Sequence, residues 1–258
     1  WCCRQMAGHC RSELLRSRVA NESRQVGRNL HANPCSMIFG RFDEEVLMWR
    51  NIPAAHGCDE WRLAREEQGR YVEGGYLLMP NQLGPAALAA FLPGFGAQHR
   101  ERMQALPHLG GTMAWIDDFE SGDLRLGEDG EVITRLPIAG RNLAMLRDSL
   151  KKGARLLLAA GAREVFLGDA AGSRFHDERE IARLDALELG GGTLSFPAPH
   201  PAGACRMGRD PQRSVVAASG ETHSVAGLYV ADPSVFPTAV SVDPSETILA
   251  FSLLLADR

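Results

Sequence analysis

Residues 200–208 read HPAGACRMG, and they carry the strongest signal in the sequence. One histidine, His200, stands there in a loop rich in proline and glycine. Residues 228–232 (LYVAD) predict a short buried strand that ends on the carboxylate of Asp232, and residues 243–246 (DPSE) open an apolar helix. A candidate base, a strand-end carboxylate and a helix N-terminus gathered near one another can form the site of a redox cofactor.

The same stretch resembles the closing segment of the glucose-methanol-choline (GMC) family of FAD-dependent alcohol oxidoreductases. That family's C-terminal signature runs roughly His-Pro-x-Gly-Thr-Cys-Arg-Met-Gly, then Leu-Tyr-Val-x-Asp-x-Ser-Val-Phe-Pro-Thr, then Asn-Pro-x-x-Thr-Ile. From His200 to Ile248 the matching residues fall in family order and spacing. A looser match over residues 25–61 is most like the bacterial and long-chain alcohol oxidase branch. Two residues depart from the pattern: Asp243 stands where the family has His or Asn, and Asn33 stands where His is common.

A dinucleotide-binding turn is not found in the sequence. Members of the family begin with a βαβ unit whose Gly-x-Gly-x-x-Gly turn places the pyrophosphate at a helix N-terminus. No such turn follows a predicted strand here, and Gly190-Gly191-Gly192 is interpreted as a flexible connector. The sequence opens on Trp1, without N-terminal signal character. We therefore expect this chain to be the C-terminal part of a longer enzyme. The N-terminal FAD-binding half of that enzyme would be missing from this chain.

Composition excludes several classes of partner. The 258 residues are 45% hydrophobic and 23% charged, which is ordinary for a globular protein. A formal net charge of −4 gives no basic footprint for nucleic acid. Apolar runs such as residues 156–160 are far shorter than the ~20 residues of a transmembrane helix.

Six cysteines match no zinc-binding spacing, and no metal site is expected. A disulfide scaffold is not favoured in a chain of this size without a secretion signal, so we expect a reducing compartment, the cytoplasm. Peripheral association with a membrane is the alternative that the sequence leaves open.

Hydrophobic periodicity predicts an α+β fold in which helices cover an antiparallel sheet. Alternation on both sides of an Asp129-Gly130 turn predicts a β-hairpin. Apolar residues at spacings of three and four predict an amphipathic helix over residues 142–160. The other predicted strands are 34–39, 71–79, 111–119 and 164–167, and the other predicted helices are 85–92 and 176–189.

The family resemblance implies three domains. Residues 1–33 would be a remnant of the FAD-binding domain, and residues 34–197 would form the substrate-binding domain. Residues 198–258 would complete the flavin site with a C-terminal strand and helix that belong to an incomplete FAD-binding α/β domain. A cluster of Gly and Pro at residues 190–199 agrees with a boundary there.

His200 is the candidate catalytic base. Oxidation of an alcohol by hydride loss requires the hydroxyl proton to leave, and a neutral imidazole near its ordinary pKa is suited to accept it. The alternative is a loop histidine with structural hydrogen bonds, which would be favoured without the surrounding motif. A pairing of His200 with Cys205 as a nucleophile is a third reading, which the family resemblance disfavours.

Asp243 has two interpretations. With Pro244 at N1 and Glu246 at N3, it completes an N-capping pattern, and capping is the favoured role. The resemblance implies a second role, because the residue in this place contacts the substrate oxygen beside the flavin. An ionised Asp cannot donate a hydrogen bond, and it would hold His200 as imidazolium. By resemblance, Asp232, Pro244 and Ser245 contact the cofactor, FAD.

The resemblance thus implies FAD-dependent oxidation of a small-molecule alcohol, with the hydroxyl proton passing to His200. A flavin-containing hydroxynitrile lyase of the same fold is one alternative, since it would use His200 as a base without redox chemistry. A catalytically inactive fragment or interaction domain is the other. The sequence does not select the alcohol or the electron acceptor.

Overall fold

The computed structural model describes residues 9–50, 52, 55–169, 171–190, 193–194 and 196–256. The chain divides into two compact units. Unit 1 consists of Trp1–Pro34, Asp117–Ala139 and Ala198–Arg258, and unit 2 consists of Cys35–Ile116 and Gly140–Pro197. Residues 117–139, which the family resemblance grouped with the substrate-binding domain, therefore belong to unit 1. Trp1 and two of the three consecutive glycines lie outside the described residues.

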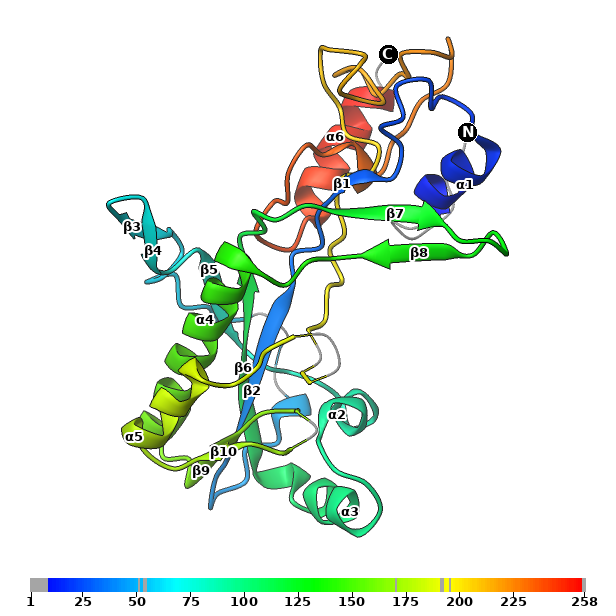
Figure 1. Cartoon of the computed structure of the whole chain (residues 1–258). Coiled ribbons are helices and arrows are strands. Elements are labelled where there is room, and N and C mark those ends of the chain that lie inside the picture. The colour runs from blue at the N-terminus through cyan, green and yellow to red at the C-terminus, as the bar shows by residue number, and fades with distance from the viewer. Residues whose placement is uncertain are drawn as a thin grey trace. The chain divides into compact units, whose positions relative to one another are not determined.

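Unit 2 is built on a five-stranded antiparallel sheet with the order β10-β9-β2-β6-β5 (Figure 1). Its central pair joins β2 to β6 along their lengths, with Cys35 opposite Trp115 and Arg41 opposite Leu109. Six of the seven residues of β2 are buried, as expected of a strand that is covered on both faces. The strands are β2 (Cys35–Arg41), β5 (Tyr76–Pro80), β6 (Leu109–Ile116), β9 (Glu164–Phe166) and β10 (Arg174–Phe175).

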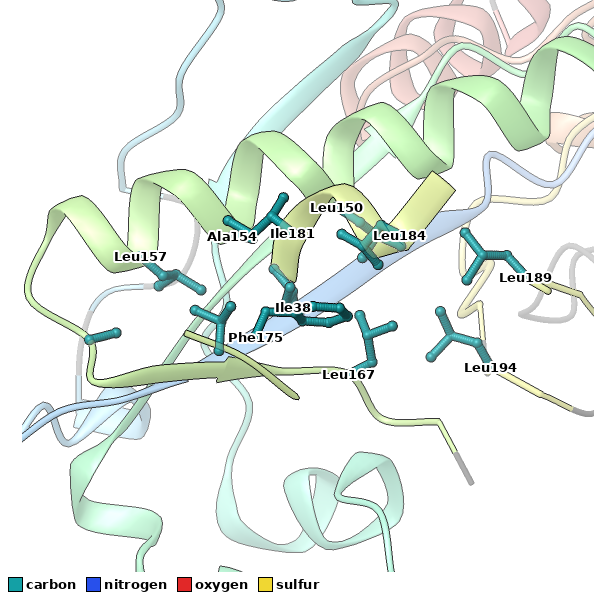
Figure 2. Close-up of a cluster of buried hydrophobic side chains, with 12 residues drawn as sticks. Ile38, Leu150, Ala154, Leu157, Leu167, Phe175, Ile181, Leu184, Leu189 and Leu194 are labelled. Carbon is teal, nitrogen blue, oxygen red and sulfur yellow. The ribbon is translucent and has the colours of Figure 1, made fainter. Parts of the chain in front are cut away.

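Helix α4 (Gly140–Ala159) covers one face of this sheet and confirms the predicted amphipathic helix. Its buried side chains, Leu150 and Ala154 among them, meet Ile38 of β2 in a continuous hydrophobic cluster. Figure 2 shows these side chains between the helix and the strands, together with Phe175 of β10. Each fully buried leucine contributes about 1.5–3 kcal/mol relative to an exposed one, so this cluster is a main source of stability for unit 2.

The opposite face of the sheet has its own cluster, because neighbouring residues of a strand point to opposite sides. Met37 and Phe39 flank Ile38 in the sequence and pack there, and the ring of Phe39 stacks on Phe166 at 5.6 Å. Leu88 of the predicted helix α2 (Pro85–Phe91) is buried against them. Helix α3 (Ala97–Gln104) and the short 3-10 turns Met48–Arg50 and Leu106–His108 complete this side of the unit.

The single strand predicted over residues 71–79 is wrong, because the chain breaks there into two strands of different sheets. Strand β4 (Arg70–Glu73) pairs with β3 (Arg65–Glu67), and β5 begins at Tyr76. Between them Gly74 and Gly75 adopt positive φ angles of 82° and 80°. A Cβ atom on Gly74 would overlap the carbonyl oxygen of Leu63, so the bend needs glycine there.

Two further predicted elements differ in extent. The strand predicted over 111–119 is β6, which begins and ends earlier, so that Trp115 and Ile116 close it. The helix predicted over 176–189 is one α-helical turn, α5 (Glu178–Ile181), followed by the 3-10 turn Ala182–Asp185. Ile181, Leu184 and Leu187 recur every three residues, which is the period of a 3-10 helix, and the first two are buried beneath α4.

Unit 1 contains a small three-stranded sheet with the order β1-β7-β8. Strands β7 (Gly122–Leu126) and β8 (Val132–Arg135) form the predicted hairpin, and Gly130 of its turn has a positive φ angle of 75°. Strand β1 (Arg28–Leu30) lies at the edge beside β7. Helices α1 (His9–Ser17) and α6 (Ser245–Ala256) and the 3-10 turn η4 (Pro233–Val235) complete the unit (Figure 1).

The strand predicted over residues 228–232 does not form in the described part of the chain. The backbone is extended there, but Tyr229 makes a single bridge with Glu221. The neighbouring polar groups bond to a turn instead, since the N–H of Val230 donates to Gly220 and the carbonyl of Leu228 accepts from Thr222. Tyr229 is exposed and Val230 is buried, so neighbouring side chains point to opposite sides as in a strand, although this segment joins no sheet.

The predicted α+β class, an antiparallel sheet with helices packed on it, is confirmed. No helix among the described residues has the length and apolar content needed to cross a membrane.

Candidate active site

The segment 200–208 is held in unit 1 by backbone hydrogen bonds to two other segments. On one side, Ala202 and His31 exchange backbone bonds of 2.7 and 2.9 Å, and the N–H of Gly27 donates to Ala204. On the other side, the N–H groups of Gly203, Cys205 and Met207 donate to the successive carbonyls of η4 (residues 233–235). These backbone hydrogen bonds on both sides fix the loop, and they fix the Cα position of His200 with it.

A sharp turn follows His200. Gly203 and Ala204 both have φ angles of 73°, in the left-handed region that favours glycine. A Cβ atom on Gly203 would overlap the carbonyl oxygen of Asn29, so the glycine of the signature is required by the close approach of the backbone of β1. Cys205 then points into the hydrophobic cluster of unit 1 and is fully buried there.

The imidazole of His200 lies between two side chains. Its Nδ1 is 3.1 Å from Oδ1 of Asn33, and its Nε2 is 2.9 Å from Oδ1 of Asp243. The His200 side chain is 14% exposed, whereas that of Asp243 is 53% exposed. The ring is therefore largely withdrawn from water, while the carboxylate on its Nε2 side is open to solvent.

Asn33 is itself held by a buried carboxylate. Oδ2 of Asp118 accepts the backbone N–H of Ala32 at 2.7 Å and that of Asn33 at 3.3 Å. Asp118 and Asn33 are both buried, and Nδ1 of His31 lies 3.8 Å from the same carboxylate oxygen. A chain of polar contacts thus runs from Asp118 through Asn33 to His200.

Burial lowers the pKa of His200 below its ordinary value of 6.5, and the nearby charge of Asp243 partly opposes this shift. Nδ1 faces an oxygen of Asn33, and Nε2 faces the carboxylate of Asp243, which favours a proton on Nε2. When no proton lies between Nε2 and Asp243, the two groups together have a free lone pair to offer. The pair is then able to accept a proton from a hydroxyl group placed beside it.

Asp243 does not cap helix α6 as the sequence pattern suggested. The carbonyl of Pro244 accepts the first helical hydrogen bond, from the N–H of Ile248 at 2.9 Å, so Pro244 occupies the N-cap position. Asp243 lies one residue before the helix, and among the described residues no backbone N–H donates to its carboxylate. The carboxylate of Asp243 contacts Nε2 of His200 and makes no N-cap hydrogen bond.

Helix α6 presents two features beside this pair. Its first N–H groups, from Ser245 onward, have no intrahelical acceptor, and they carry the positive end of the helix dipole. One side of the helix packs on the core of unit 1 through Ile248 and Phe251, whose ring meets Phe236 edge to face at 6.0 Å. The other side is apolar and open: Leu249, Leu253 and Leu254 are 62%, 57% and 65% exposed.

Asp232 lies at the N-cap of η4, where its Oδ1 accepts the backbone N–H of Ser234 at 2.8 Å. The carboxylate is half-buried. The hydroxyl of Ser234 is buried and finds no hydrogen-bond partner among the described residues. A polar group that is both buried and unpaired is costly, and this hydroxyl therefore has unused hydrogen-bonding capacity.

Sequence reasoning brought His200 and Asp243 together but missed two residues of this cluster. Asn33 was noted as a departure from the family pattern, and Asp118 was not singled out. The first is 167 positions from His200, and the second is 86 positions from Ala32. The available signal was Asn33 itself, since a short polar residue before a proline suits a turn.

Arg206 makes a structural hydrogen bond, in which its Nε donates to the carbonyl of Arg213 at 2.9 Å. The burial of Cys205 in an apolar cluster gives no support to a nucleophilic role for its thiol.

The sequence and the fold are similar to those of known oxidoreductases. Residues 127–252 match the C-terminal domain model of the GMC oxidoreductases. An uncharacterized GMC-type oxidoreductase of Mycobacterium tuberculosis is 30% identical over 246 residues, which are 95% of this chain and 37% of that protein. A long-chain-alcohol oxidase of Arabidopsis thaliana is 27% identical over 253 residues, with coverage of 90% and 32%.

Among solved structures, pyridoxine 4-oxidase from Mesorbium loti superposes with a TM-score of 0.56 at 17% identity, over 90% of this chain and 43% of that chain. This likeness shows the fold. The chain spans about a third of the length of the curated relatives that it matches.

Proposed function

Because the chain belongs to the GMC oxidoreductase family, we propose that it forms the substrate-binding and flavin-completing part of an FAD-dependent alcohol oxidoreductase. The observation that carries the proposal is the buried imidazole of His200, 2.9 Å from Asp243 and next to the start of an apolar helix. In this proposal, residues 1–33 and 198–258 complete the flavin site. Residues 34–197 supply most of the substrate-binding domain.

The residues of unit 1 fit one side of a flavin. Pro244 and Ser245 would contact the flavin where α6 begins, and the free N–H groups of the first turn would face an electron-rich edge of the flavin ring. The helix dipole there stabilises a negative charge on the ring by roughly 0.3–1 kcal/mol. Asp232 and the unpaired buried hydroxyl of Ser234 offer polar groups to the remainder of the cofactor. When bound, FAD supplies the acceptor for the hydride of the alcohol carbon.

His200 and Asp243 handle the proton. The hydroxyl of the alcohol binds at the open side of the pair and gives its proton to the deprotonated pair as the carbon loses hydride. General-base catalysis of this kind contributes on the order of 100- to 10,000-fold. Asp243 then holds the imidazolium of His200, and its exposure to water provides an exit for the proton.

The pyrophosphate-binding half of the site must come from residues outside this sequence, since no Gly-x-Gly-x-x-Gly turn follows a strand in it. We propose that the N-terminal FAD-binding half of the enzyme packs on the exposed leucines of α6. Three leucines that are more than half exposed on one helix are unusual for a solvent-facing surface, and a flavin domain would cover them.

The alcohol is a small molecule, and the long-chain-alcohol oxidases among the relatives make primary alcohols of increasing chain length the first series to test.

Anaerobic mixing of the full-length flavoprotein with alcohols tests the reaction. The oxidised flavin absorbance should bleach with a substrate, and one equivalent of aldehyde should form per flavin. A hydroxynitrile lyase would release aldehyde from a cyanohydrin while its flavin stays oxidised. A full-length protein that remains colourless after incubation with FAD would identify an interaction domain and refute the proposal.

The base is tested by His200→Ala in the same protein. Turnover should fall by two to four orders of magnitude, while FAD content and the melting temperature stay near wild type. His176→Ala is the matched control, because this histidine is exposed and belongs to unit 2. Near-normal turnover of His200→Ala would remove the histidine from the mechanism.

A further inference from the structure

We propose that a pocket of unit 2, beside strands β2, β9 and β10, binds the phosphate group of a small molecule through the guanidinium groups of Arg41, Arg163 and Arg174. The pocket has a volume of about 420 Å³, which lies within the ~300–1,000 Å³ of typical ligand pockets. All of its lining residues belong to unit 2, so it shares none with the His200 cluster of unit 1. Binding there does not require the proposed redox chemistry.

The five-stranded sheet brings the three arginines together. Arg41 is the last residue of β2, and it pairs with Glu164, the first residue of β9. The N–H of Arg163 donates to the carbonyl of Arg41 at 2.8 Å, and Arg174 begins β10, which is the next strand beyond β9 (Figure 1). The three Cα atoms are therefore held in place before any ligand binds, and this preorganisation lowers the entropic cost of binding.

The carboxylates of the pocket leave part of the positive charge uncompensated. Asp43 forms an ion pair with Arg163. Glu164 is shared, since its Oε2 lies 3.2 Å from Arg174 and its Oε1 lies 3.8 Å from Arg41. Three guanidinium groups thus face two carboxylates, and in the described part of the chain the Arg41 guanidinium donates no hydrogen bond to a protein group. An anion in the pocket would supply both an opposite charge and an acceptor.

Two histidines also line the pocket, but each has a partner of its own. Nδ1 of His176 lies 2.8 Å from Oε2 of Glu180, and its Nε2 lies 3.8 Å from Glu164. Nδ1 of His108 lies 3.1 Å from the carbonyl oxygen of Glu44. A protonated His176 and Glu180 cancel each other's charge, so this pair leaves the positive surplus unchanged. The three arginines are therefore the groups assigned to the anion.

A fourth arginine, Arg102 of helix α3, lies in the same positive field. Burial and, after it, the positive charge of Arg174 lower the pKa of the Arg102 guanidinium. The charges of Glu101, Glu164 and Asp169 act in the opposite direction and do not restore the pKa to its ordinary value. Because Arg102 and Arg174 repel each other, an anion bound beside Arg174 would be attracted by both.

The number of guanidinium groups favours a phosphate over a carboxylate. A carboxylate has two oxygens in one plane and pairs with the edge of one guanidinium group. A phosphate group on an organic molecule has three strong acceptor oxygens that point in different directions. Phe42 and Ala105 add an apolar wall to the pocket, which suits the organic part of such a molecule.

Calorimetric titration of the full-length flavoprotein, at constant ionic strength set with sodium chloride, tests the pocket with three probes. Phenyl phosphate should bind with one molecule per chain, and more tightly than inorganic phosphate, which has no apolar part. Benzoate keeps the ring and replaces the phosphate by a carboxylate. It should bind at least about tenfold more weakly than phenyl phosphate, because it engages fewer guanidinium groups.

Arg174→Gln and Arg41→Gln locate the binding. Each should weaken the binding of phenyl phosphate about tenfold or more, since a charge-assisted hydrogen bond is lost, while the melting temperature stays near wild type. Arg155→Gln is the matched control, because Arg155 is also an exposed arginine of unit 2 that forms an ion pair with a glutamate, Glu178. It should bind phenyl phosphate like wild type, and so should His200→Ala.

Phenyl phosphate binding that is unchanged in both Arg174→Gln and Arg41→Gln would overturn the proposal. Benzoate that binds as tightly as phenyl phosphate, and that is equally weakened by Arg174→Gln, would overturn the assignment to a phosphate group. Sedimentation with phosphatidylcholine vesicles, with and without phosphatidic acid, separates a lipid headgroup from a small molecule. Binding to the acidic vesicles that is lost in Arg174→Gln, without binding of phenyl phosphate, would overturn the assignment to a small molecule.

Discussion

The substitution Asp243→Asn isolates the charge beside the candidate base. Two unit charges about 4 Å apart interact by about 1 kcal/mol in water and about 4 kcal/mol at an effective dielectric constant near 20. The Asp243 side chain is 53% exposed, so solvent screening places this pair toward the lower end, at about 1–2 kcal/mol. That energy corresponds to about one pKa unit. Removing the charge removes the effect that raises the pKa of His200 and leaves the burial that lowers it.

The sign follows from the two opposing causes. Burial already holds the pKa of His200 below 6.5, and this pKa should fall further in Asp243→Asn because the opposing charge is gone. The base form then persists to lower pH, so the rise of kcat/KM with pH should move down by about one pH unit. The measurement is a pH profile of anaerobic flavin reduction in the full-length protein, with an NMR titration of His200 in parallel. Asp129→Asn, in the exposed hairpin turn, is the control for loss of a charge in unit 1.

A profile that stays in place, or that moves to higher pH, would refute this reasoning. An unmoved profile together with a shifted His200 titration would mean that another group limits the reaction. An unmoved titration would mean that Asp243 does not interact with the ring in solution as it does at 2.9 Å.

Three more substitutions test the fold and its surface. Gly203→Ala should lower the free energy of unfolding by roughly 1–3 kcal/mol in urea titration, because of the φ angle of 73° and the overlap with the carbonyl of Asn29; an unchanged midpoint would contradict this. Leu150→Ala should cost about 2–5 kcal/mol by the same measurement, since the side chain is fully buried under α4, and a loss below 1 kcal/mol would show that the cluster collapses around the gap. Leu253→Ser should lower the FAD content of the full-length protein, while Leu63→Ser, on another exposed leucine, should not; equal FAD content in the two variants would argue against a partner on α6.

The parts of the fold that the sequence predicted are those whose cause is local. The hairpin depends on an Asp-Gly turn between alternating strands, and α4 depends on apolar spacing over five turns. Both causes act within about twenty residues, which is the range that periodicity can detect.

The parts that were predicted wrongly depend on backbone contacts with residues outside the predicted segment, which hydrophobic periodicity does not detect. Residues 71–79 were predicted as one apolar strand, but Gly74 lies against the backbone of Leu63, and the bend there separates two strands of different sheets. Residues 228–232 alternate like a strand, yet their N–H and carbonyl groups bond to a turn at 220–222. In both segments a backbone contact with a neighbouring segment decides which structure forms.

The residues of the candidate site also fall into those that the sequence predicted and those that it did not. The loop of His200 and the start of α6 were recognised by their residues, while the capping role favoured for Asp243 gave way to its contact with His200. Asn33 carried only the weak local signal of a polar residue before a proline, and Asp118 carried none, because their contacts form only when the whole unit folds. The buried hydroxyl of Ser234 could not have been found from sequence, since its lack of a partner is a property of the packing.

Unit 1 is discontinuous in sequence, and this has a consequence for how the protein is made. Asn33 comes from its first stretch, Asp118 from its second, and His200 and Asp243 from its third. A ribosome therefore finishes every strand of the five-stranded sheet before it releases the histidine loop. A nascent chain interrupted at residue 197 would contain Asn33 and Asp118 but neither member of the acid–base pair, so the proposed redox chemistry could begin only after Asp243 has been translated.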